Sequence, residues 1–426
     1  MTTAVLFISF AIFLLLSVPV GIALGLATLI TVMYSGAMPI EFLAQELVTS
    51  VDSFPLMAVP FFILAGEIMG RGGITDRLFG VANALVGNKT GGFAIATIIT
   101  CMFFAAISGS APATVAAIGG IMIPAMVRMG YDKRFATATV AAAGSLGVII
   151  PPSIPMVIYG VVGSTSIGDL FIAGILPGLI VAGGLIAYAY YYSRKMGYKA
   201  SNEPFSLKKF AKTSWHAKWA LLIPIIILGG IYGGVFTPTE AAVIAVVYGL
   251  FVSTILHREL SLKQLPSVIS AGALTTATVL IIVGSATAFG KLLTREQIPS
   301  QVANWMLSIS ENPIILILLI TVLLLIVGCF MDTLAAIIIL TPLLLPIAVD
   351  IGYDPVHFGI IMVVNLAIGF ITPPLGVNLF VGSGISGLSL EELTKAIIPF
   401  FIAMIITLFI IIFIPQLSMY LPTFRG

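Results

Sequence analysis

Two apolar stretches of the chain carry polar groups suited to binding a small cation. ISGSAPAT contains Ser108 and Ser110, and CFMDTLAAI contains Asp332. Downstream of each stretch lies the motif Gly-x-x-x-Pro-Pro, which begins at Gly147 and again at Gly369. Proline has no N–H and clashes with the carbonyl one turn back, so each motif frees backbone carbonyls in an apolar helix. Carbonyl, hydroxyl and carboxylate oxygens are hard ligands, and the pattern predicts a Na+ site in each half of the chain.

Structural explanations of the same residues stay open. Asp332 could simply cap the helix that follows it, and each Pro-Pro pair could be a kink that improves packing. Charge at membrane depth is costly, however, so a carboxylate there is a functional candidate by default. Freed carbonyls in hydrocarbon are also costly unless something satisfies them. The duplication of the motif therefore favours a functional role.

The helix breaks also expose helix N-termini, which favour anionic groups. The second break is the more polar one, because Asn365, Thr372 and Asn378 take the places of an alanine, an isoleucine and a methionine of the first. The predicted contacts of an anionic substrate are Ser110, Asp332, Asn365 and Asn378.

Composition places these residues in a membrane. Of the 426 residues, 59% are hydrophobic and 8% are charged, as in multi-pass membrane proteins. A span needs about 20 apolar residues, and we expect about eight to eleven spans with shorter re-entrant pieces. The N-terminus has no basic region before its apolar run, so we expect an anchor rather than a cleaved signal peptide. The chain should therefore lie in a lipid bilayer.

The two motifs belong to an internal repeat at an offset of 222 residues. The positions that match without gaps include Pro124 with Pro346, Gly130–Asp132 with Gly352–Asp354, Gly160 with Gly382 and Pro177 with Pro399. A weaker match at an offset of 224 pairs GEIMGRGGI (66–74) with GKLLTREQI (290–298). Two related halves are typical of many membrane transporters.

Loop charges indicate that the two halves are inserted upside down relative to each other. VRMGYDKR in the first half contains three bases, whereas its counterpart VDIGYDPV contains two acids and no base. Cytoplasmic loops are enriched in Lys and Arg, so the opposite bias predicts inverted repeats. Segment 193–218 holds seven of the nineteen bases and is predicted to be a cytoplasmic linker. Its amphipathic interfacial helix would use Phe205, Leu207, Phe210, Trp215 and Trp219.

The predicted fold is an all-α polytopic membrane protein with two inverted repeats, each with a hairpin and a Pro-Pro broken helix. Small polar residues in the middle of each hairpin predict a re-entrant turn near mid-membrane, although two short tilted spans are an alternative. The first repeat is predicted to span residues 1–192, with its hairpin at about 91–127 and its broken helix at about 135–163. The second repeat is predicted to span residues 219–426, with its hairpin at about 313–349 and its broken helix at about 357–385.

Four stretches then resemble the large membrane subunit of tripartite ATP-independent periplasmic (TRAP) transporters. They are FFAAISGSAPATVAAIGGIMIPAM, LGVIIPPSIPMVIYG, GGVFTPTEAA and DPVHFGIIMVVNLAIGF. The resemblance covers nearly the whole chain and implies Na+-coupled uptake of an organic anion across the bacterial inner membrane. It also implies two partners, a periplasmic substrate-binding protein and a separate small four-helix membrane subunit. The hairpins and broken helices would form an elevator-type transport domain that moves against a scaffold.

The resemblance further implies two ligand sets. One Na+ site would use the Ser108–Ser110 tip with carbonyls around Gly147 and Ile150, and the other would use Gly328 with Gly369 and Thr372. The second tip, CFMDTLAAI, is nearer the sialic acid branch than the dicarboxylate carriers, which tend towards NFMEPSS. Sialic acid is therefore the first expected substrate, and a C4-dicarboxylate is the alternative.

Other classes of protein have weaker support. A standalone Na+/anion symporter or a channel stays open, whereas an intramembrane hydrolase using Ser108, Ser110 and Asp332 would lack a base and any GxSxG or HExxH motif. GNKT lacks the glycines of a phosphate loop, so no ATP site is expected. The basic residues lie in short loops, so no nucleic-acid binding is expected. Glu240 in TPTEAA could bind an ion, but its spacing from Thr237 is also that of a capping box.

Overall fold

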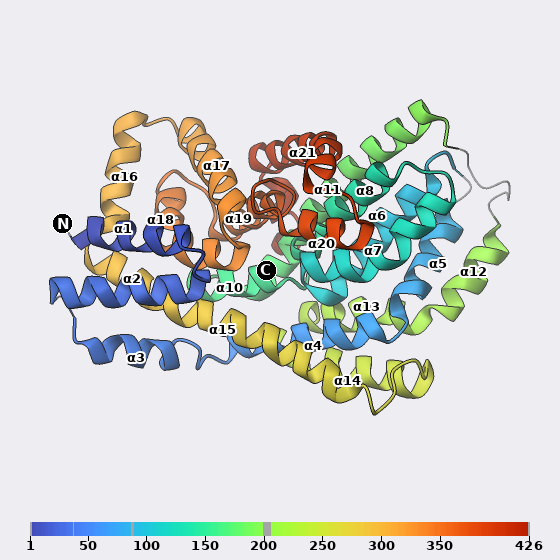
Figure 1. Cartoon of the computed structure of the whole chain (residues 1–426), viewed down its shortest axis with the longest axis horizontal. Coiled ribbons are helices and arrows are strands. Elements are labelled where there is room, and N and C mark those ends of the chain that lie inside the picture. The colour runs from blue at the N-terminus through green and yellow to red at the C-terminus, as the bar shows by residue number, and fades with distance from the viewer. Residues whose placement is uncertain (1, 37, 87–88, 199–205, 425–426) are drawn as a thin grey trace.

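The computed structural model describes residues 2–36, 38–86, 89–198 and 206–424, and all the regular elements in these ranges are helical (Figure 1). The first half contains α1 (Thr2–Leu15), α2 (Val20–Ser35), α3 (Ile40–Thr49), η1 (Pro55–Met57), α4 (Ala58–Arg71), α5 (Ile74–Val86), α6 (Gly92–Ser108), α7 (Ala111–Arg128), α8 (Lys133–Gly144), α9 (Leu146–Ile149), α10 (Ile154–Val162) and α11 (Ile167–Met196). The second half contains α12 (Leu207–His216), α13 (Lys218–Tyr232), α14 (Pro238–Leu250), η2 (Phe251–Leu256), α15 (Leu265–Arg295), α16 (Ile298–Ile309), α17 (Pro313–Phe330), α18 (Thr333–Asp350), α19 (Pro355–Gly369), α20 (Val377–Ser386), α21 (Leu390–Phe413), α22 (Gln416–Met419) and η3 (Pro422–Phe424).

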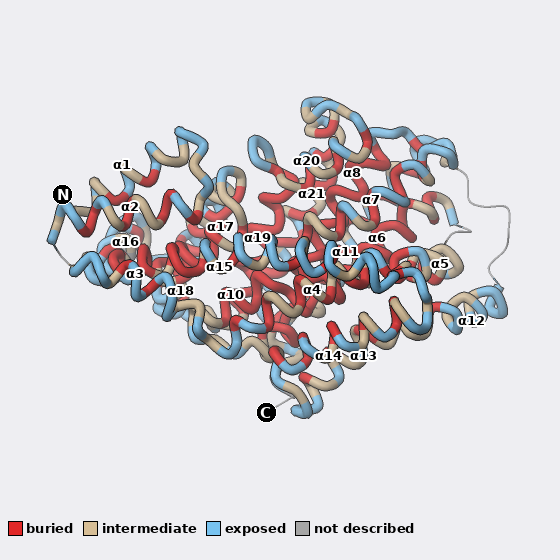
Figure 2. Tube along the Cα trace, turned by 60° about the horizontal axis from the view of Figure 1, so that its bottom comes forward, coloured by how far each residue is buried: buried red, intermediate tan, exposed pale blue. Residues whose placement is uncertain are grey.

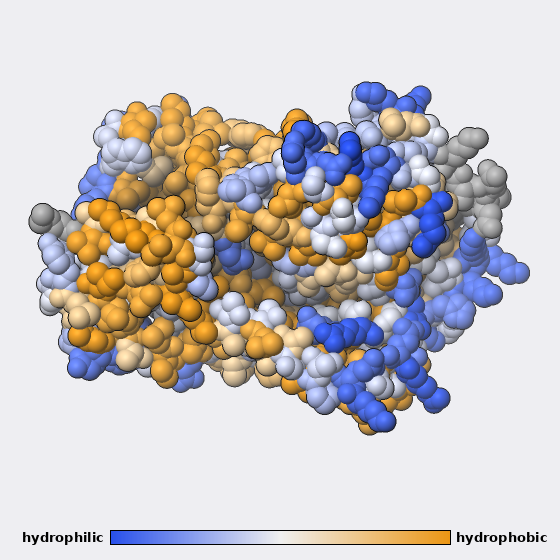
Figure 3. Space-filling model, viewed as in Figure 1, coloured by the Kyte–Doolittle hydropathy of each residue, from blue (hydrophilic) through white to orange (hydrophobic). Residues whose placement is uncertain are grey.

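The helices are apolar enough for the predicted polytopic membrane fold. By length and composition, 8 of the described helical segments could cross a membrane, or up to 10 if each of two bent pairs is one span. Orange, apolar side chains cover much of the face shown in Figure 3 around α1, α2 and α17, and hydrophilic ones gather at the opposite end near α12. The all-α multi-pass prediction is confirmed.

Helix boundaries recur at the predicted offset. Adding 222 to the bounds of α7, 111 and 128, gives 333 and 350, which are the bounds of α18. The same shift carries the first residue of α8, 133, to 355, the first residue of α19. These matches support the duplication of the chain, while the opposite orientation of the halves in the membrane stays a prediction.

Equivalent caps fix the start of both broken helices. The Asp132 carboxylate accepts hydrogen bonds from the Arg134 and Phe135 amides at 2.9 and 3.0 Å. Its counterpart 222 residues later, Asp354, accepts one from the Val356 amide at 2.7 Å. Because an N-cap carboxylate satisfies amides that have no partner inside the helix, the repeated Gly-Tyr-Asp sequence sets the same helix start twice.

The segment between the halves differs in extent from the predicted linker. α11 continues to Met196, beyond the predicted end of the first repeat at 192, and Phe205 lies outside the described residues. α12 has no buried residue, and it meets α13 at a bend of 69°. The Lys218 ammonium lies 3.8 Å from the centre of the Trp215 ring. This exposed basic and aromatic helix has the character expected at a membrane interface.

The broken helices lie at the centre of the molecule. Buried segments concentrate there, along α6 to α11 and α19 (Figure 2), and α8, α9 and α19 are buried along most of their length. α15, with 31 residues, packs along α2, α3, α4 and α18. The arrangement therefore places one long helix against both the outer helices and the second hairpin.

The inverted orientation can be tested with a pair of matched surface positions. Arg128 and Asp350 are both exposed, end α7 and α18, and are separated by the 222-residue offset. In a background with Cys101→Ser and Cys329→Ala, Arg128→Cys should react with a membrane-impermeant thiol reagent only from the cytoplasmic side, and Asp350→Cys only from the periplasmic side. Reaction of both from one side would contradict the inversion.

Candidate functional site

The first hairpin tip is a turn held by hydroxyl groups. α6 ends at Ser108, Gly109 has a left-handed φ of 59°, and α7 begins after Ser110. The Ser108 and Thr114 hydroxyl oxygens are 3.0 Å apart, and the Thr114 hydroxyl donates to the Ser110 carbonyl at 2.8 Å. Thr114 was not among the predicted site residues, although its position four residues after Ser110 is the spacing at which a helical hydroxyl reaches back to a carbonyl.

The first break packs directly on this tip. A Cβ on Gly147 would collide with the Ser110 carbonyl and lie 2.7 Å from the Thr114 hydroxyl oxygen. The Ile154 amide, at the start of α10, donates to the Gly109 carbonyl at 3.3 Å. Only a glycine lets the two backbones approach this closely.

One of the expected free carbonyls already has a partner. The Ser153 hydroxyl donates to the Val148 carbonyl at 2.6 Å and accepts a longer bond of 3.4 Å from the Met156 amide. The Val148 carbonyl, which lies between the predicted ligands Gly147 and Ile150, is therefore occupied, because the serine after the Pro-Pro pair folds back to replace the missing N–H.

The second break repeats this packing with different groups. A Cβ on Gly369 would collide with the Gly328 carbonyl and lie 2.9 Å from the Gly328 Cα. The Leu375 amide donates to the Cys329 carbonyl at 3.1 Å. The Thr372 hydroxyl donates to the Ile368 carbonyl at 2.7 Å. The two carbonyls that lose their usual amides to the prolines, Gly369 and Phe370, accept instead from the Thr372 and Asn378 backbone amides at 3.1 and 3.0 Å. Ile150 and Thr372 thus occupy equivalent positions in the two breaks, but only Thr372 has a side chain that can form a hydrogen bond.

Asp332 caps α18, as the structural explanation expected. Its carboxylate accepts a hydrogen bond of 2.9 Å from the Leu334 amide. The carboxyl group also lines a cavity of about 550 Å³. Capping and a functional role are compatible, because a carboxylate has two oxygens and about four acceptor positions.

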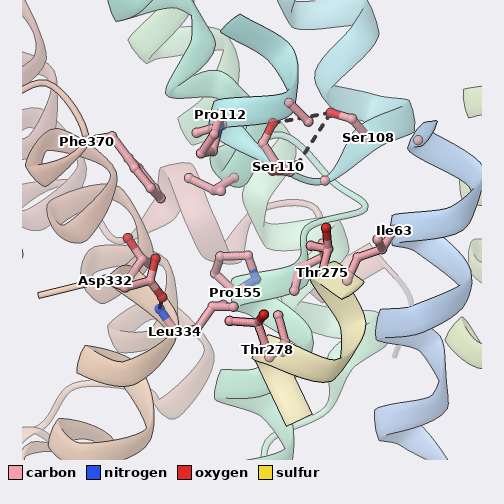
Figure 4. A pocket seen from close by; sticks show the side chains of 18 of the residues that line it. Ile63, Ser108, Ser110, Pro112, Pro155, Thr275, Thr278, Asp332, Leu334 and Phe370 are labelled. Carbon is pink, nitrogen blue, oxygen red and sulfur yellow. Dashed lines mark hydrogen bonds between the residues drawn. The ribbon is translucent and has the colours of Figure 1, made fainter. Parts of the chain in front are cut away.

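This central cavity brings both hairpin tips together (Figure 4). Ser108 and Ser110 line it from the first tip and Asp332 from the second, with Pro155 and Phe370 contributed by the two breaks. The remaining wall comes from outer helices. Gly66 and Glu67 belong to α4, and Thr275, Thr278, Val279 and Ile282 belong to α15.

The shared cavity bears on the depth of the tips. If the hairpins begin on opposite sides of the membrane, as the loop charges predict, tips of fully spanning pairs would lie about 30 Å apart on opposite surfaces. Both tips instead line one cavity of about 550 Å³. This geometry favours re-entrant hairpins over two pairs of tilted spans.

Asn365 and Asn378 lie elsewhere than expected. Both are fully buried, and neither is among the residues that line the central cavity. The Asn365 side-chain amide donates to the Thr321 carbonyl at 3.2 Å, and that of Asn378 donates to the Ala141 carbonyl at 3.0 Å. The structure therefore brings Ser110 and Asp332 to the cavity but not the two asparagines, which join α19 to α17 and α20 to α8.

The alternative role of Glu240 as an ion ligand has little support, because its carboxylate forms a capping box. It accepts hydrogen bonds from the Thr237 amide and hydroxyl at 2.8 and 2.9 Å, and the Glu240 amide donates to the Thr237 hydroxyl at 3.3 Å. Glu240 belongs to α14 and is not among the residues that line the central cavity.

A multi-pass helical protein whose duplicated hairpins and broken helices enclose one central cavity has the architecture of a membrane transport protein. Residues 7–417 match the family model described as "Tripartite ATP-independent periplasmic transporter, DctM component". The chain belongs to this family, the large permease subunits of TRAP transporters. It is a multi-pass inner-membrane transport protein and not an enzyme.

Similar proteins carry several substrate names. The chain is 53% identical over 98% of its length to "Isethionate TRAP transporter permease protein DctMQ" of Oleidesulfovibrio alaskensis, of which it spans 66%. It is 43% identical over 95% of its length to "C4-dicarboxylate TRAP transporter large permease protein DctM" of Pseudomonas aeruginosa, spanning 94% of that protein. It is 39% identical over 95% of its length to "Sialic acid TRAP transporter large permease protein SiaM" of Vibrio cholerae, spanning 94%.

A solved structure shares the fold. The YdaH transporter of Alcanivorax borkumensis, described as having "an unusual topology", superposes with a TM-score of 0.61 over 90% of this chain and 89% of its own, at 16% identity. At that identity the likeness supports the all-helical fold alone.

The close packing of each hairpin tip on its helix break predicts that alanine substitutions at two different glycines will have unequal effects on the Na+ dependence of transport. Gly369→Ala should raise the Na+ concentration for half-maximal transport by about tenfold or more, because overpacking costs about 1–3 kcal/mol where the backbone cannot yield. Gly384 in α20 has no neighbouring atom within 4 Å of the place that an alanine methyl would take, so Gly384→Ala is the matched control. Equal Na+ dependence of the two variants in proteoliposome uptake would contradict the assignment of Gly369 to a Na+ site.

A second prediction separates the charge of Asp332 from its cap. Asparagine caps helices as well as aspartate does, and glutamine can complete a capping box, so Asp332→Asn and Glu240→Gln should both fold. Only Asp332→Asn should weaken the Na+ dependence of uptake, by about tenfold if one ion contact is lost. The measurement is initial uptake against external Na+, and equal effects of the two substitutions would mean that Asp332 is only a cap.

Proposed function

We propose that the chain performs Na+-coupled uptake of a small organic anion through the central cavity. The observation that supports it most is the meeting of both hairpin tips and both helix breaks at one cavity of about 550 Å³. Oxygen groups gather behind the tips at Ser108, Ser110 and Thr114 and at Gly328, Gly369 and Thr372. These two groups are the candidate Na+ sites, one in each half.

The charges of the cavity supply a reason for coupling. Among the described residues that line it, the charged ones are Glu67 and Asp332, both acidic. Arg71 lies 3.6 Å from the Glu67 carboxylate and offsets part of its charge, so an organic anion would meet an unfavourable potential chiefly at Asp332, since like charges repel strongly where water is excluded. Na+ ions bound behind the tips would reverse that potential. Anion binding would therefore follow Na+ binding, which is the order that a symporter needs.

The division of the cavity wall supports an elevator-type motion. One wall consists of hairpin tips and breaks, and the other consists of α4 and α15. A body formed by the hairpins, the broken helices and the helices packed on them, α11 and α21, could slide along α15 and carry its tips with it. Alternating access by movement of one body against the other is common among transporters built from repeats.

Among the possible substrates, we favour a small hydroxylated anion with isethionate first. The identity to the isethionate permease, 53%, exceeds that to the C4-dicarboxylate and sialic acid relatives, 43% and 39%. This ordering gives sialic acid, the first expectation from the second hairpin tip, less support than a sulfonate. The proposed partners are those of the family, a small membrane subunit and a periplasmic substrate-binding protein.

The proposal is tested by uptake in proteoliposomes that contain the chain with its small subunit. Labelled isethionate, a C4-dicarboxylate and sialic acid are each supplied on a binding protein, under an inward Na+ gradient or with K+ in its place. We expect one anion to accumulate only with both Na+ and the binding protein present. Accumulation that needs neither would refute the proposal, and full transport without the small subunit would favour a standalone symporter.

A further inference from the structure

A second cavity, of about 330 Å³, lies further along α15. α15 contributes Val283, Ala286, Thr287, Gly290, Lys291 and Thr294 to its wall. These positions continue the three- and four-residue spacing with which Thr275, Thr278, Val279 and Ile282 line the central cavity, so they form one stripe on one face of the helix. From Thr278 to Lys291 the stripe rises about 20 Å along the axis.

The two cavities have matching positions in the two halves. Gly66 and Glu67 line the central cavity, and the residues 224 positions later, Gly290 and Lys291, line the second. Ala116 of α7 lines the first, and Ile338 of α18, 222 positions later, lines the second. The repeat therefore relates the two cavities, and at one matched position the charge of the side chain changes sign: Glu67 of the first cavity corresponds to Lys291 of the second.

Lys291 presents its charge to the second cavity. Its ammonium donates to the Glu46 carboxylate at 2.6 Å, and the side chains are 53% and 8% exposed, respectively. The carboxylate is thus buried behind the ammonium, which faces the open side. An ammonium has three donors, and this bond engages one.

Hydroxyl oxygens flank the ammonium on the same helix face. The hydroxyls of Thr287 and Thr294 donate to carbonyls of their own helix, those of Val283 and Gly290, at 2.8 and 3.0 Å. Their oxygens keep lone pairs that could accept a hydrogen bond from a hydroxyl of the ligand. An ammonium between two acceptors suits an acid that also carries a hydroxyl group.

The sequence places this cavity on the side opposite the basic loops. α15 has bases near both ends, Arg258 and Lys263 before it and Arg295 at its last residue, so its own flanks do not decide its direction. Val161 and Val162, which also line the cavity, end α10, and α10 is the far part of the broken helix that begins at Lys133, in the basic loop VRMGYDKR. By the distribution of Lys and Arg in loops, the Lys291 end is periplasmic.

We propose that the second cavity is a periplasmic-side anion site in which Lys291 receives the carboxylate or sulfonate of the incoming substrate. The site rests on the proposed uptake function and adds a loading step to it. Lys291 attracts the anion on the side where it arrives, whereas the matched position in the central cavity holds the acid Glu67. Glu46 holds Lys291 in place and competes with the substrate for its charge.

Two substitutions distinguish this role from a purely structural ion pair. Lys291→Gln should raise the KM for isethionate uptake by about tenfold or more, since it removes a charge-assisted hydrogen bond to the anion. Lys291→Arg should restore most of the loss. Glu46→Gln should act in the opposite direction and lower KM, because it removes the competing carboxylate. If the ion pair between Lys291 and Glu46 were purely structural, Lys291→Gln and Glu46→Gln would both lower the stability of the protein and leave KM unchanged.

The control is Lys395→Gln, which removes a lysine paired with Glu391 at 2.8 Å on α21 and should leave KM unaltered. An unchanged KM in Lys291→Gln, with Na+-driven uptake by the wild type intact, would overturn the anion site and leave the proposed function standing.

If the wild type took up none of the three anions, the proposed uptake function would be refuted instead. The site is then tested alone by the rise in melting temperature of the purified complex on adding isethionate or sulfate, which Lys291→Gln should abolish and Lys395→Gln should keep. An equal rise in both variants would overturn it.

Discussion

In hydrocarbon every backbone polar group needs a partner, and a Pro-Pro pair in mid-helix withdraws two amides at once. The structure meets this requirement by laying a hairpin tip against each break. The glycine of each break, Gly147 or Gly369, allows the tip backbone to approach. The Ser153 hydroxyl occupies a freed carbonyl in the first half, and the Asn378 backbone amide occupies one in the second. Tip and break thus form one unit in each half, and the placement of the cavity follows from the meeting of these two units.

Much of the architecture could be predicted because it is encoded locally and encoded twice. The offset of 222 residues carries the bounds of α7 onto α18 and the start of α8 onto α19, and the Gly-Tyr-Asp sequence gives the cap at each start. The tips were visible as Ser108, Ser110 and Asp332 in apolar surroundings. The contribution of α4 and α15 to the wall of the central cavity could not be predicted, since only tertiary packing decides which faces of separate helices meet. Ser153 could not be predicted for a related reason: a hydroxyl among apolar residues has no pattern until its acceptor is known. Thr114 did have a signal, its spacing of four residues from Ser110.

The two asparagines lie away from the central cavity, so their predicted contact with the substrate stays a prediction. Asn365 and Asn378 are the most polar side chains near the second break, which made them candidates for the substrate. In the structure the Asn378 amide reaches the Ala141 carbonyl of the opposite half. The Tyr159 hydroxyl likewise crosses between halves to donate to the Pro355 carbonyl at 2.7 Å. These bonds join the two broken helices across the repeat boundary and help to hold the halves together as one body. The side-chain oxygens of Asn365 and Asn378 are buried and have no hydrogen-bond partner among the described residues.

The same symmetry that duplicates the backbone leaves the charges unequal, and the inequality has a consequence for direction. A strictly symmetric transporter would offer the anion the same potential from both sides, and only the ion gradient would distinguish them. Here the matched scaffold positions hold Glu67 and Lys291, and the tips hold Asp332 where the first repeat has Ser110. In the proposed uptake, an anion would meet a base first and acids afterwards, and it would occupy the acidic central cavity while cations are bound beside it. Release of those cations on the side of low Na+ would leave the anion against two carboxylates, which favours its departure.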